Sequence, residues 1–302
     1  MKRPFIAIAG SLNMDLVVSA DRQPKLGETI QGSSIDQVPG GKGANQAVGC
    51  ARLGAHAAMI GCVGNDDFGV RMLDNLTHNG VDSQAIAVLE DVPSGIASIT
   101  RTPEDNCIIV VDGANGRCDG AAVNRHAGVL ERADVLLVQL EIPLEGVRTA
   151  MGLASGGDAT VILNPAPAQA LPEDLLRLAD YITPNESEWE LLSGTRVRDD
   201  EALRTSMLEW ERRLGSKVVV TRGKDGCSYL EEERLVTVPA PATEVVDTTG
   251  AGDTFNAALA YALGSGTSLA AAVELAIRCA SLSVRRFGAQ GGMPTGEEAG
   301  LA

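Results

Sequence analysis

The stretch "DVLLVQLEIPLEGVRTAMGLASGGDATVILN", from Asp134 to Asn164, contains two apolar runs separated by a helical pattern. The runs at 134–140 and 160–164 are continuous instead of alternating, which predicts strands that are buried on both faces. Residues 144–155 between them predict a helix. A strand, a helix and a second strand in this order predict two parallel strands joined by a crossover helix.

The same alternation continues along the rest of the chain. Further apolar runs predict strands at 5–10, 57–63, 180–183 and 217–221, and helical patterns lie at 43–53, 67–79, 172–178, 186–193, 199–214, 252–263 and 268–286. Continuous apolar strands separated by helices predict an α/β fold, with a mostly parallel sheet covered on both faces.

Two segments interrupt this rhythm. "ETIQGSSIDQVPGG" at 28–41 is extended, polar and rich in turn residues, and "GIASITRTPEDNCIIVVDGAN" at 95–115 predicts two strands around the turn "TPEDN". Neither segment has enough apolar residues to fold alone. They predict either ordinary surface hairpins or a small sheet that acts as a lid over one edge of the main domain, and the pattern favours neither.

Composition limits the possible partners. The chain has 302 residues, of which 44% are hydrophobic, so it can form one large α/β domain with additions or two domains. Only 3% are aromatic, so aliphatic residues and alanine must do most of the packing. The net charge of 25 − 40 = −15 argues against binding to nucleic acid or to anionic membranes. An anionic ligand would therefore need backbone donors, a few cations or a metal.

The cysteines and the N-terminus indicate the compartment. None of the cysteines forms a C-x-x-C pair and most lie in apolar runs, so we expect reduced core residues and neither a disulfide framework nor a zinc site. They are Cys50, Cys62, Cys107, Cys118, Cys227 and Cys279. The first apolar run is too short for a signal peptide, and no run is long enough to span a bilayer. We expect a soluble, cytoplasmic protein.

The motif "VDTTGAGDTF" at 246–255 places Gly250, Gly252 and Asp253 directly before an apolar helical pattern. Asp253 is suited to be a simple helix N-cap. Alternatively, the free N–H groups of the helix N-terminus form an anion site, and the carboxylate beside it accepts a proton from an acceptor hydroxyl. The motif alone leaves both interpretations open.

A second glycine-rich motif, "PGGKGANQAV" at 39–48, lies at another loop-to-helix junction. It is not a Walker A loop, because Asp36 and Gly43 stand where that motif requires glycine and Ser or Thr. It predicts either a site for a polar ligand or a glycine-rich turn with a solvated lysine.

Polar side chains also follow several of the predicted strands. Asn13 and Asp15 in "GSLNMD" end the first strand and Glu141 in "QLEIP" ends another, at the sheet edge where α/β proteins bind ligands. They suit the hydroxyls of a sugar, or they are turn and cap residues. Asn185 and Glu188 in "TPNESE" are either ligands or a capping pair. "TRGKDG" at 221–226 predicts a strand that opens into a tight turn.

In their order along the chain, "GSLNMD", "GGKGANQAV", "LNPAP", "TPNESE", "TRGKDG" and "VDTTGAGDTFNAAL" resemble the PfkB-type carbohydrate kinases nearly end to end. "GGKGANQAV", "QLEIPLE" and "GAQ" at 288–290 resemble the ribokinase branch in particular. The resemblance implies a three-layer α/β sandwich with a small β-sheet lid. The main domain would comprise 1–13, 39–93 and 113–302, and the lid 14–38 and 94–112.

The resemblance also implies an activity. It implies an ATP-dependent sugar kinase that uses Mg²⁺, is activated by K⁺, and phosphorylates the 5-hydroxyl of ribose, often as a homodimer joined through two lids. Fructose, deoxyribose and nucleoside kinases of the family are the alternatives. A non-catalytic sugar-binding regulator would be expected to lose the base or the anion site. A nicotinamide-dependent oxidoreductase would need a glycine fingerprint after the first strand, which "AGSLNMD" lacks.

The residue roles that the resemblance implies fall into four groups. Asp253 would be the catalytic base, beside an anion hole formed by Gly250, Ala251 and Gly252. The sugar would contact Asn13, Asp15, Gly41, Lys42, Asn45, Glu141 and Asp253. The nucleotide would contact Asn185, Thr221, Arg222, Gly223, Lys224, Asp225, Gly226, Gly252 and Ile277. Glu188 would act on Mg²⁺ through water, and the monovalent cation would be held by Asp247, Thr249, Ser283, Arg286, Gly288 and Gly292.

Three positions depart from the family pattern. Gly292 replaces a small polar residue at the cation site, and Ile277 replaces a polar residue near the adenine. Met14 replaces a small residue beside the sugar-binding Asn13. Asn13 itself is an amide that suits a hydroxylated sugar, whereas members that prefer deoxyribose tend to carry an apolar residue there.

Overall fold

The structure is a computed structural model that describes residues 2–104 and 106–301. Asp105, in the expected turn between two strands of the lid, lies outside the described residues, as do positions 1 and 302 at the ends of the expected main domain.

A large, mostly parallel sheet forms the centre of the molecule, which confirms the predicted fold class. Within the described residues it has nine strands in the order β13-β12-β11-β10-β9-β8-β1-β4-β5. The pairs from β5 to β11 are parallel, and only β12 and β13 run antiparallel to their neighbours. The strands are β1 (Phe5–Ala9), β4 (His56–Gly64), β5 (Asp82–Leu89), β8 (Val135–Val138), β9 (Thr160–Leu163), β10 (Tyr181–Ile182), β11 (Lys217–Thr221), β12 (Cys227–Glu231) and β13 (Arg234–Val238).

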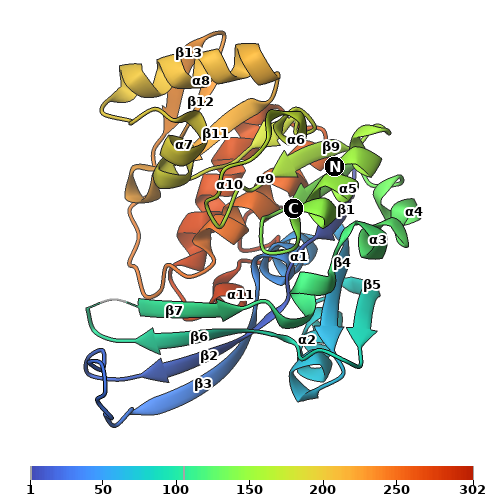
Figure 1. Cartoon of the computed structure of the whole chain (residues 1–302). Helices are drawn as coiled ribbons and strands as arrows, with labels where there is room; N and C mark the ends of the chain where they lie inside the picture. Colours follow the sequence, from blue (N-terminus) through green and yellow to red (C-terminus); the bar gives the residue numbers. More distant parts are fainter. Residues whose placement is uncertain (1, 105, 302) are drawn as a thin grey trace.

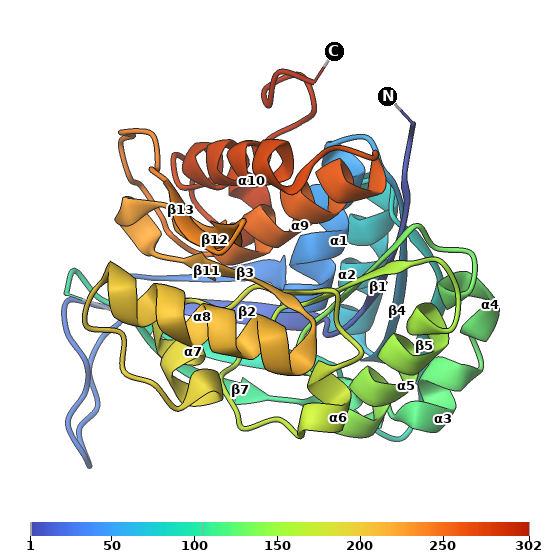
Figure 2. The same ribbon diagram turned by 90° about the horizontal axis from the view of Figure 1, so that it is seen from above.

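Helices cover both faces of this sheet (Figures 1 and 2). One face carries α1 (Lys42–Arg52), α2 (Asp67–His78), α9 (Ala251–Gly264) and α10 (Leu269–Ser283). The other carries α3 (Gly120–Asn124), α4 (Ala127–Leu130), α5 (Leu144–Ser155), α6 (Glu173–Leu176), α7 (Glu186–Ser193) and α8 (Asp200–Leu214). Short helical turns lie at η1 (Gly113–Arg117), η2 (Gly223–Asp225) and α11 (Ala289–Gly292). No described helix is both long and apolar enough to cross a membrane.

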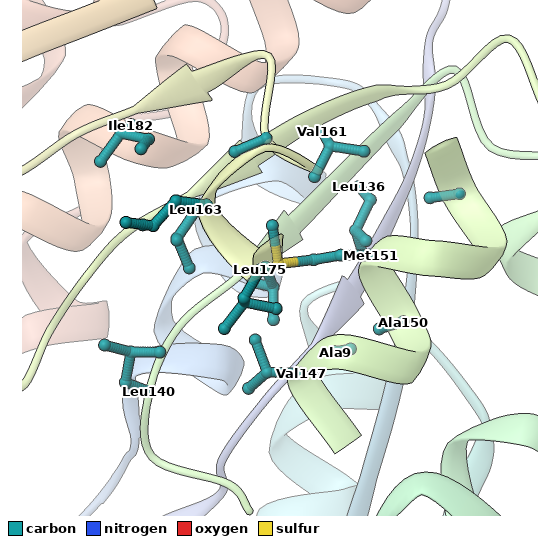
Figure 3. Packing of buried hydrophobic residues seen from close by; sticks show 14 of the residues in the cluster. Ala9, Leu136, Leu140, Val147, Ala150, Met151, Val161, Leu163, Leu175 and Ile182 are labelled. Carbon is teal, nitrogen blue, oxygen red and sulfur yellow. The ribbon is translucent and has the colours of Figure 1, made fainter. Parts of the chain in front are cut away.

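The core is aliphatic, as the composition predicts. Successive residues of β1 alternate between the two faces: Ile6 and Ile8 pack with α1 and α9, and Ala7 and Ala9 pack with the helices of the opposite face. Figure 3 shows part of the cluster that contains Ala9, where Val147, Ala150 and Met151 of α5 lie against the strands. Burial on both faces explains why the strands read as continuous apolar runs.

A second, smaller sheet projects from the main domain (Figure 1). Its strands are β2 (Asn13–Ser19), β3 (Ser34–Gly40), β6 (Gly95–Arg101) and β7 (Asn106–Val111), in the order β3-β2-β6-β7. The β2–β6 pair is parallel and the other two pairs are antiparallel. Among its described residues, Val17, Ala97 and Ile99 form a buried cluster of their own, so the sheet has little core, as expected. We call these four strands the lid sheet.

The structure corrects several expectations. Asn13 and Asp15 do not end the first strand, because β1 stops at Ala9 and both residues lie on β2 of the lid sheet. Only 34–40 of the segment 28–41 forms a strand. Five cysteines are buried, but Cys107 is exposed because it lies on β7. Strands β5, β12 and β13 were not predicted from the sequence.

Candidate active site

Asp253 lies in the first turn of α9 and is not its N-cap. The N-cap is Gly250, with a positive φ of 76°, and no side chain caps the helix. A Cβ on Gly250 would lie 2.6 Å from the Cβ of Ala289, so the turn requires glycine here. The interpretation of Asp253 as a simple cap is therefore wrong. The helix N-terminus keeps the polar, positive character that favours an anion.

The Asp253 carboxylate is almost completely buried, with 6% of the residue exposed. Two amides from α1 hold it: Nδ2 of Asn45 donates to Oδ2 at 2.9 Å, and Nε2 of Gln46 donates to Oδ1 at 3.0 Å. Asp253 also lines a pocket of about 140 Å³, which is formed by Lys42, Asn164, Ala166, Thr183, Asn185, Glu188, Thr221, Gly250, Gly252, Asp253 and Asn256. The two glycine-rich motifs, near 40 and near 250, thus meet at one carboxylate.

The N-terminus of α1 is capped by a residue from another strand end. Gly41 is the N-cap and supplies no side chain, but the Lys42 backbone N–H donates to Oε2 of Glu141 at 3.0 Å. The hydroxyl of Ser11 donates to the same oxygen at 2.5 Å. Glu141 therefore lies beside the α1 N-terminus, as expected for a site residue, but one of its oxygens already serves as a cap. Ser11 has no signal in the sequence that points to this role.

The Lys42 ammonium is surrounded by carboxylates. Asp253 makes the largest contribution that raises the pKa of Lys42, burial opposes it, and Glu141 and Glu188 add to the rise. Lys42 therefore stays cationic beside the pocket, and it is a counter-charge for acids that would otherwise repel an anionic ligand.

Asn13 is oriented by a residue that sequence reasoning missed. Nδ2 of Asn115 donates to Oδ1 of Asn13 at 2.8 Å and to the Leu12 carbonyl at 3.0 Å, and the Leu12 N–H donates to Oδ1 of Asn115. Because Oδ1 of Asn13 is used, its Nδ2 is the group left to donate to a ligand. The neighbouring Met14 is fully buried in the core behind β2, so it does not line the site.

Asp15 has a strongly shifted titration. Burial and the nearby charges of Glu141 and Asp253 raise the pKa of Asp15 to about 7, and Lys42 opposes this rise. Asp15 lines a second pocket, of about 300 Å³, between the lid sheet and the main domain. The other residues of this pocket include Val17, Val38, Ile99, Arg101, Asp247, Thr249, Phe287 and Gly288. The guanidinium of Arg101 lies 5.0 Å from the ring centroid of Phe287, so the lid sheet and the loop after α10 contact each other.

Asn185 and Glu188 form a capping box at the start of α7. The Glu188 N–H donates to Oδ1 of Asn185 and the Asn185 N–H donates to Oε2 of Glu188, both at 2.8 Å. Burial raises the pKa of Glu188, while the Asn185 hydrogen bond and Lys42 oppose the rise. The capping interpretation is confirmed, and both residues also line the Asp253 pocket, so the two interpretations do not exclude each other.

A third pocket, of about 560 Å³, lies beside the N-terminus of α9. Gly223, Lys224, Ala251 and Ile277 line it together with Ala240, Pro241, Ala242, Thr243, Val245, Thr248, Ala280, Ser281 and Val284. Of the motif "TRGKDG", Gly223 and Lys224 line this pocket, whereas the next residues described have other contacts. The guanidinium of Arg222 is bound to Asp200 at 2.9 Å and lies 3.5 Å from Glu186, and Asp225 and Gly226 form the turn that returns into β12.

The loop after α10 comes close to Asp247. Oδ1 of Asp247 accepts the N–H and the hydroxyl of Thr249 at 2.9 and 2.6 Å, and Oδ2 accepts the Gly288 N–H at 2.9 Å. Burial opposes these hydrogen bonds, but together they hold the pKa of Asp247 below its usual value. Arg286 is paired with Glu298, and Arg286 and Gly292 line a further pocket of about 340 Å³. Ser283 ends α10 on the buried side.

A metal site built from protein side chains alone is not found within 2–104 and 106–301: no three His, Cys, Asp or Glu residues gather there in a suitable way. The residues around Glu188 fit an ion that is held by one carboxylate and by phosphate oxygens, which is the usual way in which Mg²⁺ binds at such sites.

Residues 3–296 match the family model described as pfkB family carbohydrate kinase. The chain belongs to this family. The pfkB-family chain is 45% identical over 293 residues to a ribokinase from Bacillus subtilis, with 97% of both chains covered. It is 32% identical over 295 residues to a deoxyribokinase from Salmonella typhi, with 97% of this chain and 96% of the relative covered.

A solved structure of Arabidopsis thaliana ribokinase, complexed with ribose and ATP, superposes with a TM-score of 0.92 at 31% identity and covers 99% of this chain and 98% of that one. The similarity therefore includes both sheets. The pfkB assignment and the predicted fold, which the motif order indicated, are confirmed.

Proposed function

We propose that the chain is an ATP-dependent ribokinase, which transfers the γ-phosphate of ATP to the 5-hydroxyl of D-ribose. The observation that carries this proposal is the position of Asp253: a buried carboxylate at the N-terminus of α9, held by Asn45 and Gln46 in a pocket shared with Lys42. The B. subtilis and A. thaliana ribokinases support the choice of sugar and nucleotide.

In the proposed reaction, Asp253 accepts the proton of the 5-hydroxyl group of the sugar. The oxygen of that hydroxyl bonds to the γ-phosphorus of ATP, and the bond between the γ-phosphorus and the oxygen that leaves with ADP breaks. Phosphoryl transfer depends mainly on positioning and on charge stabilisation. The Gly250–Gly252 turn supplies the positive end of α9 for the charge on the transferred group. Lys42, whose pKa is raised chiefly by Asp253, adds a fixed positive charge.

The nucleotide would occupy the 560 Å³ pocket between Lys224 and Ile277, with its phosphates directed toward Asn185 and Gly252. Ile277 offers only apolar contact, so the adenine would be held there by packing. Thr221 lines the Asp253 pocket and Gly223 lines the 560 Å³ pocket, so this turn connects the two. The Arg222 guanidinium is paired with Asp200 and Glu186, and we therefore do not assign it a phosphate.

Two ions belong to the proposal. Mg²⁺ would neutralise phosphate charge, with Glu188 holding it through water, because only one of its oxygens is required by the capping box. K⁺ would be held by Asp247 and Thr249, together with backbone carbonyls of Ser283, Arg286, Gly288 and Gly292. There it would fix the loop after α10 next to the N-terminus of α9.

A second candidate sugar is deoxyribose, because the S. typhi relative is a deoxyribokinase. The orientation of Asn13 favours ribose. Asn115 holds Oδ1 of Asn13, so an N–H donor remains for a sugar hydroxyl, and a sugar without that hydroxyl would leave the donor unpaired.

A coupled ADP-release assay over ribose, 2-deoxyribose, fructose and nucleosides, with Mg²⁺ and K⁺, tests the proposed function. Ribose should give the highest kcat/KM. A higher value for another sugar would replace ribose as the substrate, and no ADP release with any of them would overturn the kinase assignment.

We also propose a homodimer joined through the lid sheet, and the cytoplasmic location stays a prediction.

A further inference from the structure

Gln46 lies behind the Asp253 carboxylate and is fully buried. Its Nε2 donates to Oδ1 of Asp253 at 3.0 Å and to Oδ1 of Asn164 at 3.1 Å, which uses both amide hydrogens. Asn164 is itself oriented, because its Nδ2 donates at 3.2 Å to the Thr183 carbonyl, which can only accept. Oδ1 of Asn164 therefore faces Gln46.

The other end of the Gln46 amide is fixed by Gln139, which follows β8. Nε2 of Gln139 donates to Oε1 of Gln46. Gln46 thus has two acceptors at its nitrogen and a donor at its oxygen. Only one orientation satisfies all three, because turning the amide over would place Oε1 against the carboxylate of Asp253 and against Oδ1 of Asn164.

The side-chain carbonyl of Gln139 lacks a hydrogen-bond donor among the residues that the structure describes. It is fully buried, and no group in the described part of the chain donates to its Oε1. A buried carbonyl without a protein donor destabilises a fold, and an apolar side chain of the same length would avoid that loss. Such departures from good packing are expected at functional sites, so the position of Gln139 points to a role beyond stability.

We propose that Gln46, held by Gln139, is a positioning residue that fixes the plane of the Asp253 carboxylate for proton transfer from the sugar. This inference rests on the proposed function. Asn45 holds the second carboxylate oxygen, and Nε2 of Gln290 orients Asn45 in the same way by donating to its Oδ1 at 3.0 Å. Asp253 is therefore held at both oxygens and cannot rotate without losing a hydrogen bond.

Each oxygen of a carboxylate accepts about two hydrogen bonds, so each keeps one acceptor position when Asn45 and Gln46 are bound. A general base must reach its proton within hydrogen-bond distance and at a suitable angle. A misplacement of about 1 Å can lower the rate about 100-fold. Loss of the Gln46 donor should therefore lower kcat more than it raises KM.

The test compares Gln46→Met, Gln139→Met and the double variant, because methionine keeps the length of glutamine and removes its polar groups. Gln46→Met should lower kcat about 10- to 100-fold, with KM for ribose within about threefold. Gln139→Met should lower kcat by a smaller factor, while its melting temperature stays near that of the wild type, since it exchanges one unpartnered carbonyl for another.

The double variant separates positioning from stability. It leaves no unpaired group between the two side chains, so its melting temperature should exceed that of Gln46→Met. Its kcat should stay as low, because Gln139 acts only through Gln46. Ser216 precedes β11, at the opposite end of that strand from the pocket residue Thr221. The matched control is Ser216→Ala, which removes a buried hydroxyl that accepts a hydrogen bond from Nε1 of Trp210 at 3.0 Å. It should lose stability and keep its kcat.

Two outcomes overturn the inference: a kcat for Gln46→Met within about twofold of the wild type, or a double variant that regains activity together with stability. Either result leaves the proposed function intact if the wild type phosphorylates ribose. A wild-type protein without kinase activity would instead overturn the proposed function, and the inference with it.

Discussion

Nδ2 of Asn45 lies 2.9 Å from Oδ2 of Asp253, although the two residues are 208 positions apart in the sequence. Asn45, which is expected to bind the sugar, therefore also binds the carboxylate of Asp253, which is expected to deprotonate the sugar hydroxyl. The contact couples the N-terminal half of α1 to the first turn of α9, and these are the two helices whose start motifs carry the family pattern.

We expect Asp253→Asn to lower kcat about 100-fold or more, because an amide cannot accept the hydroxyl proton. One of its contacts to Asn45 and Gln46 would also become donor against donor. Ribose affinity should stay within about tenfold, since other residues hold the ground state. ADP-release kinetics and titration calorimetry measure the two effects, and a variant with more than about a tenth of the wild-type kcat would rule out a base role.

The pKa of about 7 for Asp15 predicts that sugar binding depends on pH. A carboxylate accepts hydrogen bonds from sugar hydroxyls better than a protonated acid does. KM for ribose should therefore fall about tenfold between about pH 6 and about pH 8, as Asp15 loses its proton. Asp15→Asn should bind more weakly and show a flat profile over this range. A wild-type KM that is independent of pH would contradict the assignment.

The same shift has a consequence for stability. The pKa of Asp15 is raised from 3.8 to about 7 in the fold, so its contribution is favourable below about pH 4 and is lost as the pH rises through about 7. We expect Asp15→Asn to melt a few degrees higher than the wild type at about pH 8, with the difference gone at about pH 4. A variant that melts lower than the wild type at the higher pH would contradict a pKa of Asp15 that burial and the charges of Glu141 and Asp253 raise.

The sequence predicted the sheet because its strands are buried on both faces, so 135–138 and 160–163 needed no tertiary information. β13 was missed because none of its residues is fully buried, and β12 because the buried Ser228 interrupts its apolar run. Asn13 and Asp15 were placed at the end of the first strand because β2 begins only a few residues after β1 ends. Composition alone could not separate the lid sheet from surface hairpins, since its core is three residues.

The site was predictable where a motif fixes local geometry, and unpredictable where it depends on long-range pairs. Gly250 and Asp253 follow from one turn and one helix start. Ser11, Asn115 and Gln139 act on residues that lie 130, 102 and 93 positions away. Such contacts exist only after the parallel sheet has brought the strand ends together.

Gly292 gives a prediction about the monovalent cation. A Cβ there would lie 2.2 Å from the Ser283 carbonyl oxygen, so glycine allows the two backbones of the loop to approach. We expect activity to be higher in K⁺ than in Na⁺ or a bulky organic cation. Gly292→Ala should reduce this activation and should destabilise the fold by about 1–3 kcal/mol. Equal rates of the wild type in all three salts would remove K⁺ from the proposal.

The last prediction concerns the lid sheet, whose edge strand β7 is exposed along its whole length. Four consecutive apolar residues, Ile108, Ile109, Val110 and Val111, are 47–65% exposed. An exposed apolar strand at the edge of a sheet is a ready pairing surface, and natural proteins usually cover it. Two lid sheets that pack on each other in an isologous dimer would cover both edges at once.

We therefore expect a dimer in light scattering at micromolar protein, with ribose slowing hydrogen exchange of the amides at 95–104 and 106–112. Ile109→Lys should weaken dimerisation about tenfold or more, because a lysine buried in the contact would have to lose its hydration. Leu191→Lys is the matched control: Leu191 is 50% exposed, against 65% for Ile109, but it lies on α7 of the main domain. If only Leu191→Lys dissociates the dimer, the contact between the subunits lies on another face. A wild type that is monomeric, and whose lid amides exchange hydrogen at the same rate with and without ribose, would contradict both the dimer and the closure over the sugar.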